Sequence, residues 1–147
     1  MSKQQSRGLR NCNPGNIRRS NFRYVGERPS STDSEFRQFV SMEYGYRALF
    51  RLLRTYDYIH HRRTIRTVIE RYAPPSENNT AAYIRRVVER TGFDADRELN
   101  TLCHDDMVAL AAAISEVENG TMPNMEEVEA GWKLFIEQFK PGATAVR

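Results

Sequence analysis

Apolar residues recur at helical spacing through most of the chain after residue 40. The first such stripe consists of Tyr46, Leu49, Phe50 and Leu53. Their i, i+3, i+4, i+7 spacing is typical of a helix that buries one face. Ser41 precedes the stripe and can cap the helix, with Glu43 in its first turn. We therefore expect the first long helix to follow Ser41.

Four further segments predict helices by the same rule. Pro74-Pro75 ends the first of these four, and Gly92 and Gly120 suit the C-terminal ends of the next two. Trp132 lies on the apolar stripe of the last segment, so we expect it in the core. The expected ranges are Ile65–Tyr72, a segment through Tyr83 to Gly92, Asp105–Glu118, and Val128–Phe139.

The first forty residues have a different pattern, with short aromatic segments separated by turn-forming residues. The aromatic segments are 22–25 and 36–39, and Gly26, Pro29 and residues 30–33 lie between them. Turn-forming residues between two short aromatic segments favour a small β-hairpin. The sequence predicts a mainly α, α+β fold in a single domain over residues 1–147. In that domain we expect residues 1–6 disordered, a β-hairpin lobe at 7–40 and a helical lobe at 41–140.

Composition limits the classes of protein to which the chain can belong. The 147 residues are 28% charged and 39% hydrophobic, with a net charge of +3, which fits a globular chain. No apolar run is long enough for a membrane span, and no hydrophobic segment follows the N-terminus. We therefore expect synthesis in a bacterial cytoplasm without a signal peptide, and no membrane insertion. Two Cys and three His without ligand spacing predict no metal and no cofactor.

Arginine carries most of the positive charge, and Arg47, Arg51 and Arg54 form a helical stripe. Such a stripe is usually a solvated face, although it also suits an anionic wall polymer or the phosphates of a nucleic acid. No predicted helix combines this charge with base-reading amides, so we do not expect nucleic acid as a partner.

The segment from Arg7 to Arg18 contains three asparagines and a Pro14-Gly15 turn. Buried amides must each find hydrogen-bond partners, so a core does not need so many of them. One interpretation is a polar loop before the first helix. The other is a ligand-facing loop that binds a polar, amide-bearing or hydroxylated substrate.

Glu118 stands out among the acidic residues by its position in the helix. At 100° per residue it lies within about 40° of the apolar Met107, Ala111 and Ile114, whereas Glu116 points to the opposite side. Partial burial and the C-terminal end of the helix dipole both disfavour a charged carboxylate. These are the conditions for a general acid, although Glu118 could also simply pair with an arginine at the core edge.

Several segments together resemble the small lysozyme-like proteins, described as muramidases or lytic transglycosylases, that bacteriophages and prophages encode. The similar segments include Arg10-Asn-Cys-Asn-Pro-Gly-Asn-Ile-Arg18, residues 36–49, residues 71–84 and Glu118-Asn-Gly120. The chain is also similar to the bacterial glucosaminidase family in a different order. In that family the glutamate-bearing helix end comes first, whereas here it comes last, which suggests a circular permutation of a lysozyme-like fold.

The resemblance implies roles for particular residues. Glu118 would be the catalytic acid, and Tyr83 would stabilise charge or position the sugar. The residues expected to bind the glycan are Asn11, Asn13, Asn16, Phe39 and Asn119. We specifically expect Asn13 and Asn16 to face Glu118 across a cleft.

Hydrolysis by water usually needs a second carboxylate, for which Glu27, Asp33 and Glu35 are the candidates. If none serves, one glutamate acts first as acid and then as base, and a hydroxyl of the substrate attacks to give an anhydro-sugar. The expected function is cleavage of the MurNAc–GlcNAc backbone of peptidoglycan by a monomer. The alternative is a glycan-binding structural component of a virion or secretion apparatus. Either role requires delivery to the cell wall by a holin, a virion or a secretion machine, and virion or secretion-system proteins are then possible partners.

Overall fold

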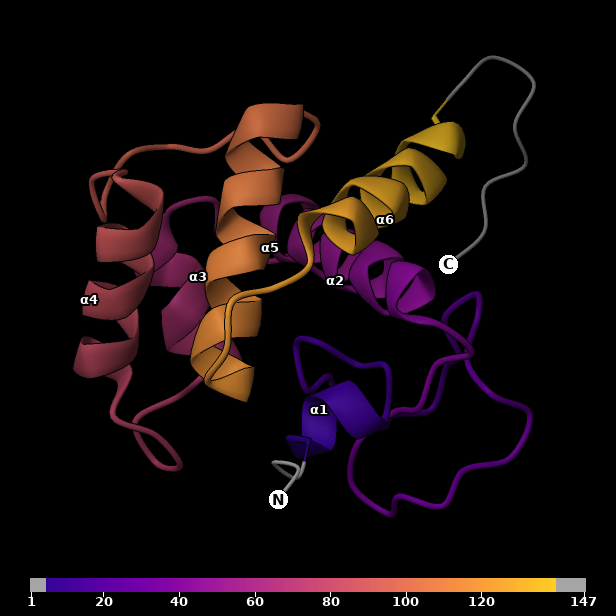
Figure 1. The fold of residues 1–147 in the computed structure, drawn as a ribbon. Coiled ribbons are helices and arrows are strands. Elements are labelled where there is room, and N and C mark those ends of the chain that lie inside the picture. Colours follow the sequence, from indigo (N-terminus) through magenta and orange to yellow (C-terminus); the bar gives the residue numbers. More distant parts are fainter. Residues whose placement is uncertain (1–4, 140–147) are drawn as a thin grey trace.

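A computed structural model describes residues 5–139 and is mainly helical (Figure 1). The N-terminal segment with the short helix α1 lies beside the end of α5, and the longer helices pack on one another. Among the described residues no helix is long and apolar enough to span a membrane. The helices are α1 (Arg7–Arg10), α2 (Met42–Tyr58), α3 (Ile65–Tyr72), α4 (Thr80–Thr91), α5 (His104–Asn119) and α6 (Met125–Glu137).

The five helices expected after residue 40 are confirmed, and their ends follow from local chemistry. Ser41 accepts a hydrogen bond from the backbone N–H of Tyr44 and so caps α2. Asn79 caps α4 in the same way. Gly92 and Gly120 follow α4 and α5 with φ of 74° and 72°, the left-handed conformation that glycine adopts without strain.

The core lies where α2 is covered by α6 and α5. Tyr46, Leu49, Phe50 and Leu53 are all buried, which confirms the expected stripe. Trp132 of α6 is buried too, and its ring meets the edge of Phe50 at 5.2 Å between centroids. The N-terminal segment packs against this helical core, with α1 in contact with α5.

The expected β-hairpin in residues 7–40 is wrong. Within the described residues this region contains two isolated antiparallel bridges, Arg18 with Phe36 and Glu27 with Phe39, instead of a ladder. Side chains replace the ladder: the Arg37 guanidinium donates to the carbonyl oxygens of Arg18 and Phe22. The region also begins with α1, which the turn-rich pattern did not indicate.

The expected disorder of residues 1–6 falls mainly on residues 1–4, which lie outside the described residues. Residue 140, the last of the expected helical lobe, also lies outside them. Ser6 makes specific hydrogen bonds and does not fit that expectation. Its hydroxyl caps α1 by accepting from the N–H of Leu9, and it donates to Asn119 Oδ1 at 2.7 Å. The chain is therefore anchored to the end of α5 from its first described turn.

The arginine stripe of α2 is not a solvated face. Arg47 and Arg54 are buried, with 4% and 8% of their surfaces exposed. Arg54 donates to Thr101 at 2.9 Å and lies 3.9 Å from the carboxylate of Asp57. These arginines therefore belong to the interior, and the charge available to a ligand comes from elsewhere.

Candidate active site

A cleft of about 560 Å³ separates the N-terminal segment from the helices. Residues 15–20 form one wall, together with Phe22, Phe36 and Arg37. The facing wall comes from α2, the end of α3 and the turn that follows it: Leu52, Tyr56, Arg71, Tyr72, Ala73, Pro74, Glu77 and Asn78. Glu118, from the last turn of α5, also lines this cleft.

Glu118 is half-buried and is held by two donors from different parts of the chain. The side-chain amide of Asn16 donates to its Oε1 at 2.8 Å. The hydroxyl of Tyr83, on α4, donates to its Oε2 at 2.8 Å. These donors lie 102 and 35 residues away in sequence, so the fold assembles a single carboxylate site from three segments.

The end of α5 is fixed by the residue after Glu118. Asn119 donates its amide to the carbonyl oxygens of Pro14 and Ser115, both at 2.9 Å. Its own Oδ1 accepts the Ser6 hydroxyl. Asn119 therefore ties α5 to the 11–18 loop, and Glu118 is directed into the cleft.

Two tyrosines pack beside the carboxylate. The rings of Tyr72 and Tyr83 meet edge to face at 6.5 Å, and Tyr72 donates to the carbonyl oxygen of Gly15. Burial raises the pKa of both hydroxyls well above the usual value, and the nearby Glu118 carboxylate adds to that rise. Both hydroxyls therefore stay protonated near neutral pH and remain available as donors.

The loop needs glycine where it meets the helices. A Cβ on Gly15 would clash with the Tyr72 hydroxyl and lie 3.1 Å from Leu49. A Cβ on Gly8 would lie 2.9 Å from the carbonyl oxygen of Asn13 and 3.0 Å from Asn16 Oδ1. Asn16 has a φ of 49°, a left-handed conformation that asparagine tolerates better than most residues. The close approach brings the Asn16 amide to Glu118.

The other expected glycan contacts have structural roles instead. Asn13 has no exposed surface, and its amide binds the carbonyl oxygens of Ile17 and Arg37 and the N–H of Ile17. The expectation that Asn13 faces Glu118 is therefore wrong, whereas Asn16 does face it.

Asn11, Phe39 and Asn119 are likewise turned inward. Asn11 is 4% exposed and uses its amide to bind Asp33 and Gln38. Phe39 has no exposed surface, and Asn119 is satisfied by the three contacts described above. None of the three lines the cleft, so direct contact with a glycan is not supported for them.

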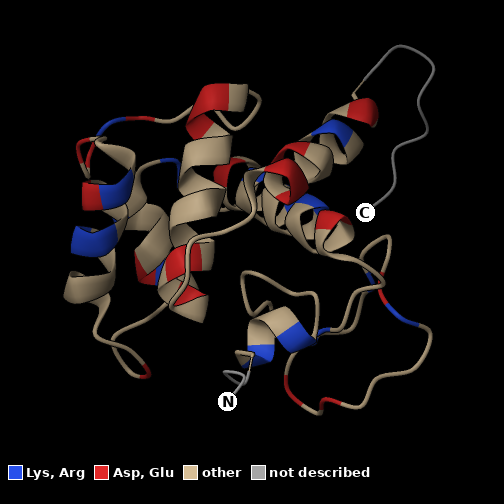
Figure 2. Ribbon diagram, viewed as in Figure 1, with Lys and Arg blue, Asp and Glu red and all other residues tan. Residues whose placement is uncertain are grey.

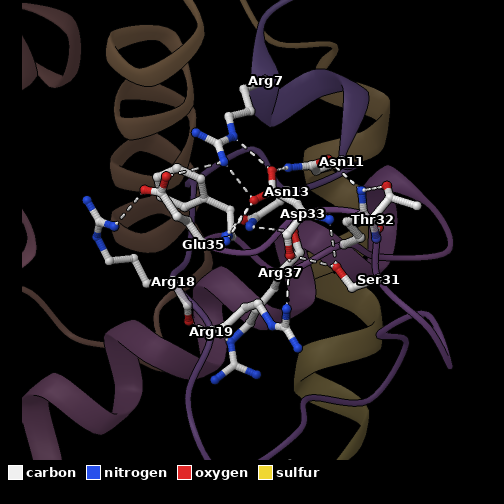
Figure 3. A network of polar contacts seen from close by, with 12 residues as sticks. Arg7, Asn11, Asn13, Arg18, Arg19, Ser31, Thr32, Asp33, Glu35 and Arg37 are labelled. Carbon is white, nitrogen blue, oxygen red and sulfur yellow. Dashed lines mark hydrogen bonds and ion pairs between the residues drawn. The ribbon is translucent and has the colours of Figure 1, made fainter.

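None of the three expected second carboxylates lines the cleft. Glu27 is half-buried in an ion pair with Arg37. Glu35 is exposed and lies 3.4 Å from Arg18. Asp33 accepts from Nε and Nη2 of Arg7, both at 2.8 Å, and from the amide of Asn11, in the network that Figure 3 shows. It also accepts from the backbone N–H groups of Glu35 and Phe36. These carboxylates hold the N-terminal segment together.

Sequence reasoning missed several cleft residues. Tyr72 lies on the apolar stripe of its helix, and that spacing does not indicate that its hydroxyl donates to the loop. Glu77 and Arg71 lie beside the Pro74-Pro75 turn, where no spacing pattern distinguishes them from other charged residues. Glu77 is the other carboxylate among the lining residues, and it lies 3.8 Å from Arg18. Among residues 5–139 no three His, Cys, Asp or Glu side chains are grouped as a metal site.

The chain is similar to Protein P5 of the Pseudoalteromonas phage PM2. The two are 34% identical over 134 residues, which cover 88% of this chain and 82% of the phage protein. No protein-family model matches the chain.

The half-buried Asp33 network predicts a pH-dependent loss of stability. The Arg7 guanidinium, with the N–H of Phe36 and the Asn11 amide, holds the pKa of Asp33 well below its usual range, although burial opposes this. Such a group stabilises the fold above its unfolded pKa and loses that contribution as the pH falls. We expect Asp33→Asn to lower the free energy of unfolding by about 1–2 kcal/mol at pH 7. The difference from wild type should shrink below about pH 4.

Urea titrations at pH 7 and pH 3 measure this difference. Glu35→Gln is the matched control, because its exposed carboxylate should change stability by less than about 0.5 kcal/mol. A deficit of Asp33→Asn that is the same at both pH values would contradict the ionic character of the network.

Proposed function

We propose that this chain, which belongs to the family of Protein P5 of the Pseudoalteromonas phage PM2, is a peptidoglycan glycosidase. The proposed reaction is cleavage of the glycan backbone between N-acetylmuramic acid and N-acetylglucosamine. One observation carries the proposal: a half-buried glutamate in a cleft, held by an amide and a tyrosine hydroxyl from distant segments.

Glu118 is the proposed acid and base. As the acid it protonates the glycosidic oxygen, which makes the departing sugar a neutral alcohol. The Asn16 N–H donates to Oε1, so that oxygen is the carbonyl oxygen of the protonated carboxyl. The proton then lies on Oε2, beside the Tyr83 hydroxyl, which can accept as well as donate. Tyr83 can thus hold the carboxyl in both of its protonation states.

Proton transfer leaves a carboxylate, to which the Asn16 amide already donates and to which the Tyr83 hydroxyl donates once its hydrogen has rotated. Hydrogen bonds to an ionised group are about twice as strong as those between neutral groups. Their strengthening as charge develops on Glu118 lowers the barrier to proton transfer without moving either donor atom. Asn16 and Tyr83 therefore contribute through Glu118, and Asn16 also lines the cleft that receives the sugar.

A lysozyme-like fold is the proposed frame for this chemistry. The proposal rests on the helical lobe with its glutamate at a helix end, and on the order of segments that suggests a circular permutation of the glucosaminidase type. The N-terminal segment takes the part of the second lobe, and the cleft between the two lobes is the proposed glycan groove.

The lytic transglycosylase reaction is favoured over hydrolysis. Glu27, Asp33 and Glu35 are engaged away from the cleft, and the remaining lining carboxylate, Glu77, is 58% exposed and close to Arg18. With one suitable carboxylate, Glu118 gives its proton to the leaving oxygen and then takes one from a hydroxyl of the muramic acid. That hydroxyl attacks the anomeric carbon, so the bond to the leaving sugar breaks and no water is consumed.

The first prediction of this proposal is that Glu118→Gln loses activity. We expect turbidity clearing of purified peptidoglycan to slow roughly 100-fold or more, because the amide cannot donate an acidic proton. Glutamine still offers Asn16 and Tyr83 hydrogen-bonding atoms, so the variant should fold.

Glu116→Gln is the matched control, because it lies on the same helix and pairs with Arg90 outside the cleft. It should clear the substrate at nearly the wild-type rate. Equal clearing by wild type and Glu118→Gln would remove the catalytic role of Glu118. If neither protein clears peptidoglycan but both bind it, the chain is a glycan-binding structural component, and the enzymatic proposal fails.

The products give a second prediction. Mass spectrometry of the released muropeptides should find anhydro-muramic acid ends, each lighter by one water than the hydrolysed product. Digestion in isotopically labelled water should leave the label out of these ends. Reducing ends that carry the label would instead assign a lysozyme-type hydrolysis and require Glu77 or another carboxylate to activate water.

A further inference from the structure

The cleft around Glu118 carries an excess of positive charge that the proposed cleavage does not use. Its lining contains two glutamates, Glu77 and Glu118. It also contains four arginines: Arg18, Arg19, Arg37 and Arg71. Basic residues are otherwise spread over α1, α2, α3, α4 and the N-terminal segment, while α6 carries mainly acidic ones (Figure 2). The cleft therefore differs from the rest of the surface because several arginine side chains line a single groove.

Two of the four arginines are neutralised within the fold. Arg37 is buried and paired with Glu27. Arg18 lies 3.4 Å from Glu35 and 3.8 Å from Glu77, and its guanidinium stacks over Phe36. Neither presents an uncompensated charge to a ligand.

Arg19 and Arg71 are different. Arg19 donates to the carbonyl oxygen of Asp33, and Arg71 lies 5.4 Å from the centre of the Tyr56 ring. Both are exposed, and neither forms an ion pair with a carboxylate among residues 5–139. They stand on facing walls of the cleft, one on the N-terminal segment and one on α3.

We propose that Arg19 and Arg71 bind the carboxylates of the stem peptides that peptidoglycan strands carry on their muramic acid residues. This inference rests on the proposed function, and it names the substrate class as peptide-bearing glycan instead of bare glycan or chitin. A bare strand of N-acetylated sugars is neutral and offers no partner for two guanidinium groups. A stem peptide projects from the sugar next to the scissile bond and ends in carboxylates. Guanidinium groups bind carboxylates with a planar pair of donors.

The test measures binding separately from cleavage, in the full chain with Glu118→Gln so that the substrate persists. Co-sedimentation compares intact peptidoglycan with chitin, a peptide-free strand of N-acetylated sugars that carries no carboxylate. We expect tighter binding to the intact polymer, and added salt should weaken only that preference. Adding Arg71→Gln should weaken binding to intact peptidoglycan roughly fivefold, and Arg19→Gln should act similarly. Binding to peptide-free strands should stay unchanged.

Arg86→Gln is the control, because this exposed arginine of α4 lies outside the cleft. Equal affinity for intact and peptide-free strands would overturn the inference, and so would equal losses from Arg71→Gln and Arg86→Gln. The proposed function would survive either result if wild type still clears peptidoglycan. Failure to bind either polymer, with no clearing by wild type, would defeat the proposed function and this inference together.

Discussion

Asn119 holds together the two parts of the chain on which the candidate site depends. One amide group donates to the carbonyl oxygens of Pro14 and Ser115 and accepts the hydroxyl of Ser6. The chain thus joins its first described turn, the 11–18 loop and the end of α5 at a single buried side chain. Because these hydrogen bonds fix the end of α5, they also set the direction of the neighbouring Glu118 side chain. Its contact with Asn16 exists because the loop cannot move away from α5.

The same junction explains why an amide-rich loop is mostly buried. A segment without a β-ladder leaves backbone groups unpaired, and buried backbone groups need partners. The Asn13 amide and the Arg37 guanidinium supply these partners. Asn11 adds side-chain hydrogen bonds to Asp33 and Gln38, so the loop is held by its own side chains. Asn16 is the asparagine of the loop whose amide reaches the cleft, because its positive φ turns it outward toward Glu118. The loop is therefore a scaffold for one functional amide.

The features that depend on residues close together in sequence could be predicted from apolar spacing and helix caps. The helices followed from apolar spacing and from caps such as Ser41 and Gly120, and the inward direction of Glu118 followed from its place on α5. The N-terminal segment could not be predicted in this way, because long-range side-chain bonds determine it. The roles of Asn13 and Asn16 could not be separated either, since one residue type serves both. The cleft arginines Arg19 and Arg71 become recognisable only once the pairs of the other arginines are known.

The central claim is that the loop and the end of α5 form one site through Asn16 and Glu118, and a double-mutant cycle tests it most directly. Urea unfolding of Asn16→Ala, Glu118→Ala and the double variant should give a coupling energy of about 1–2 kcal/mol. The same cycle with Glu116→Ala, a residue that pairs with Arg90, should be additive within about 0.5 kcal/mol. Additive effects of Asn16→Ala and Glu118→Ala would contradict the account, because the two side chains would then not interact.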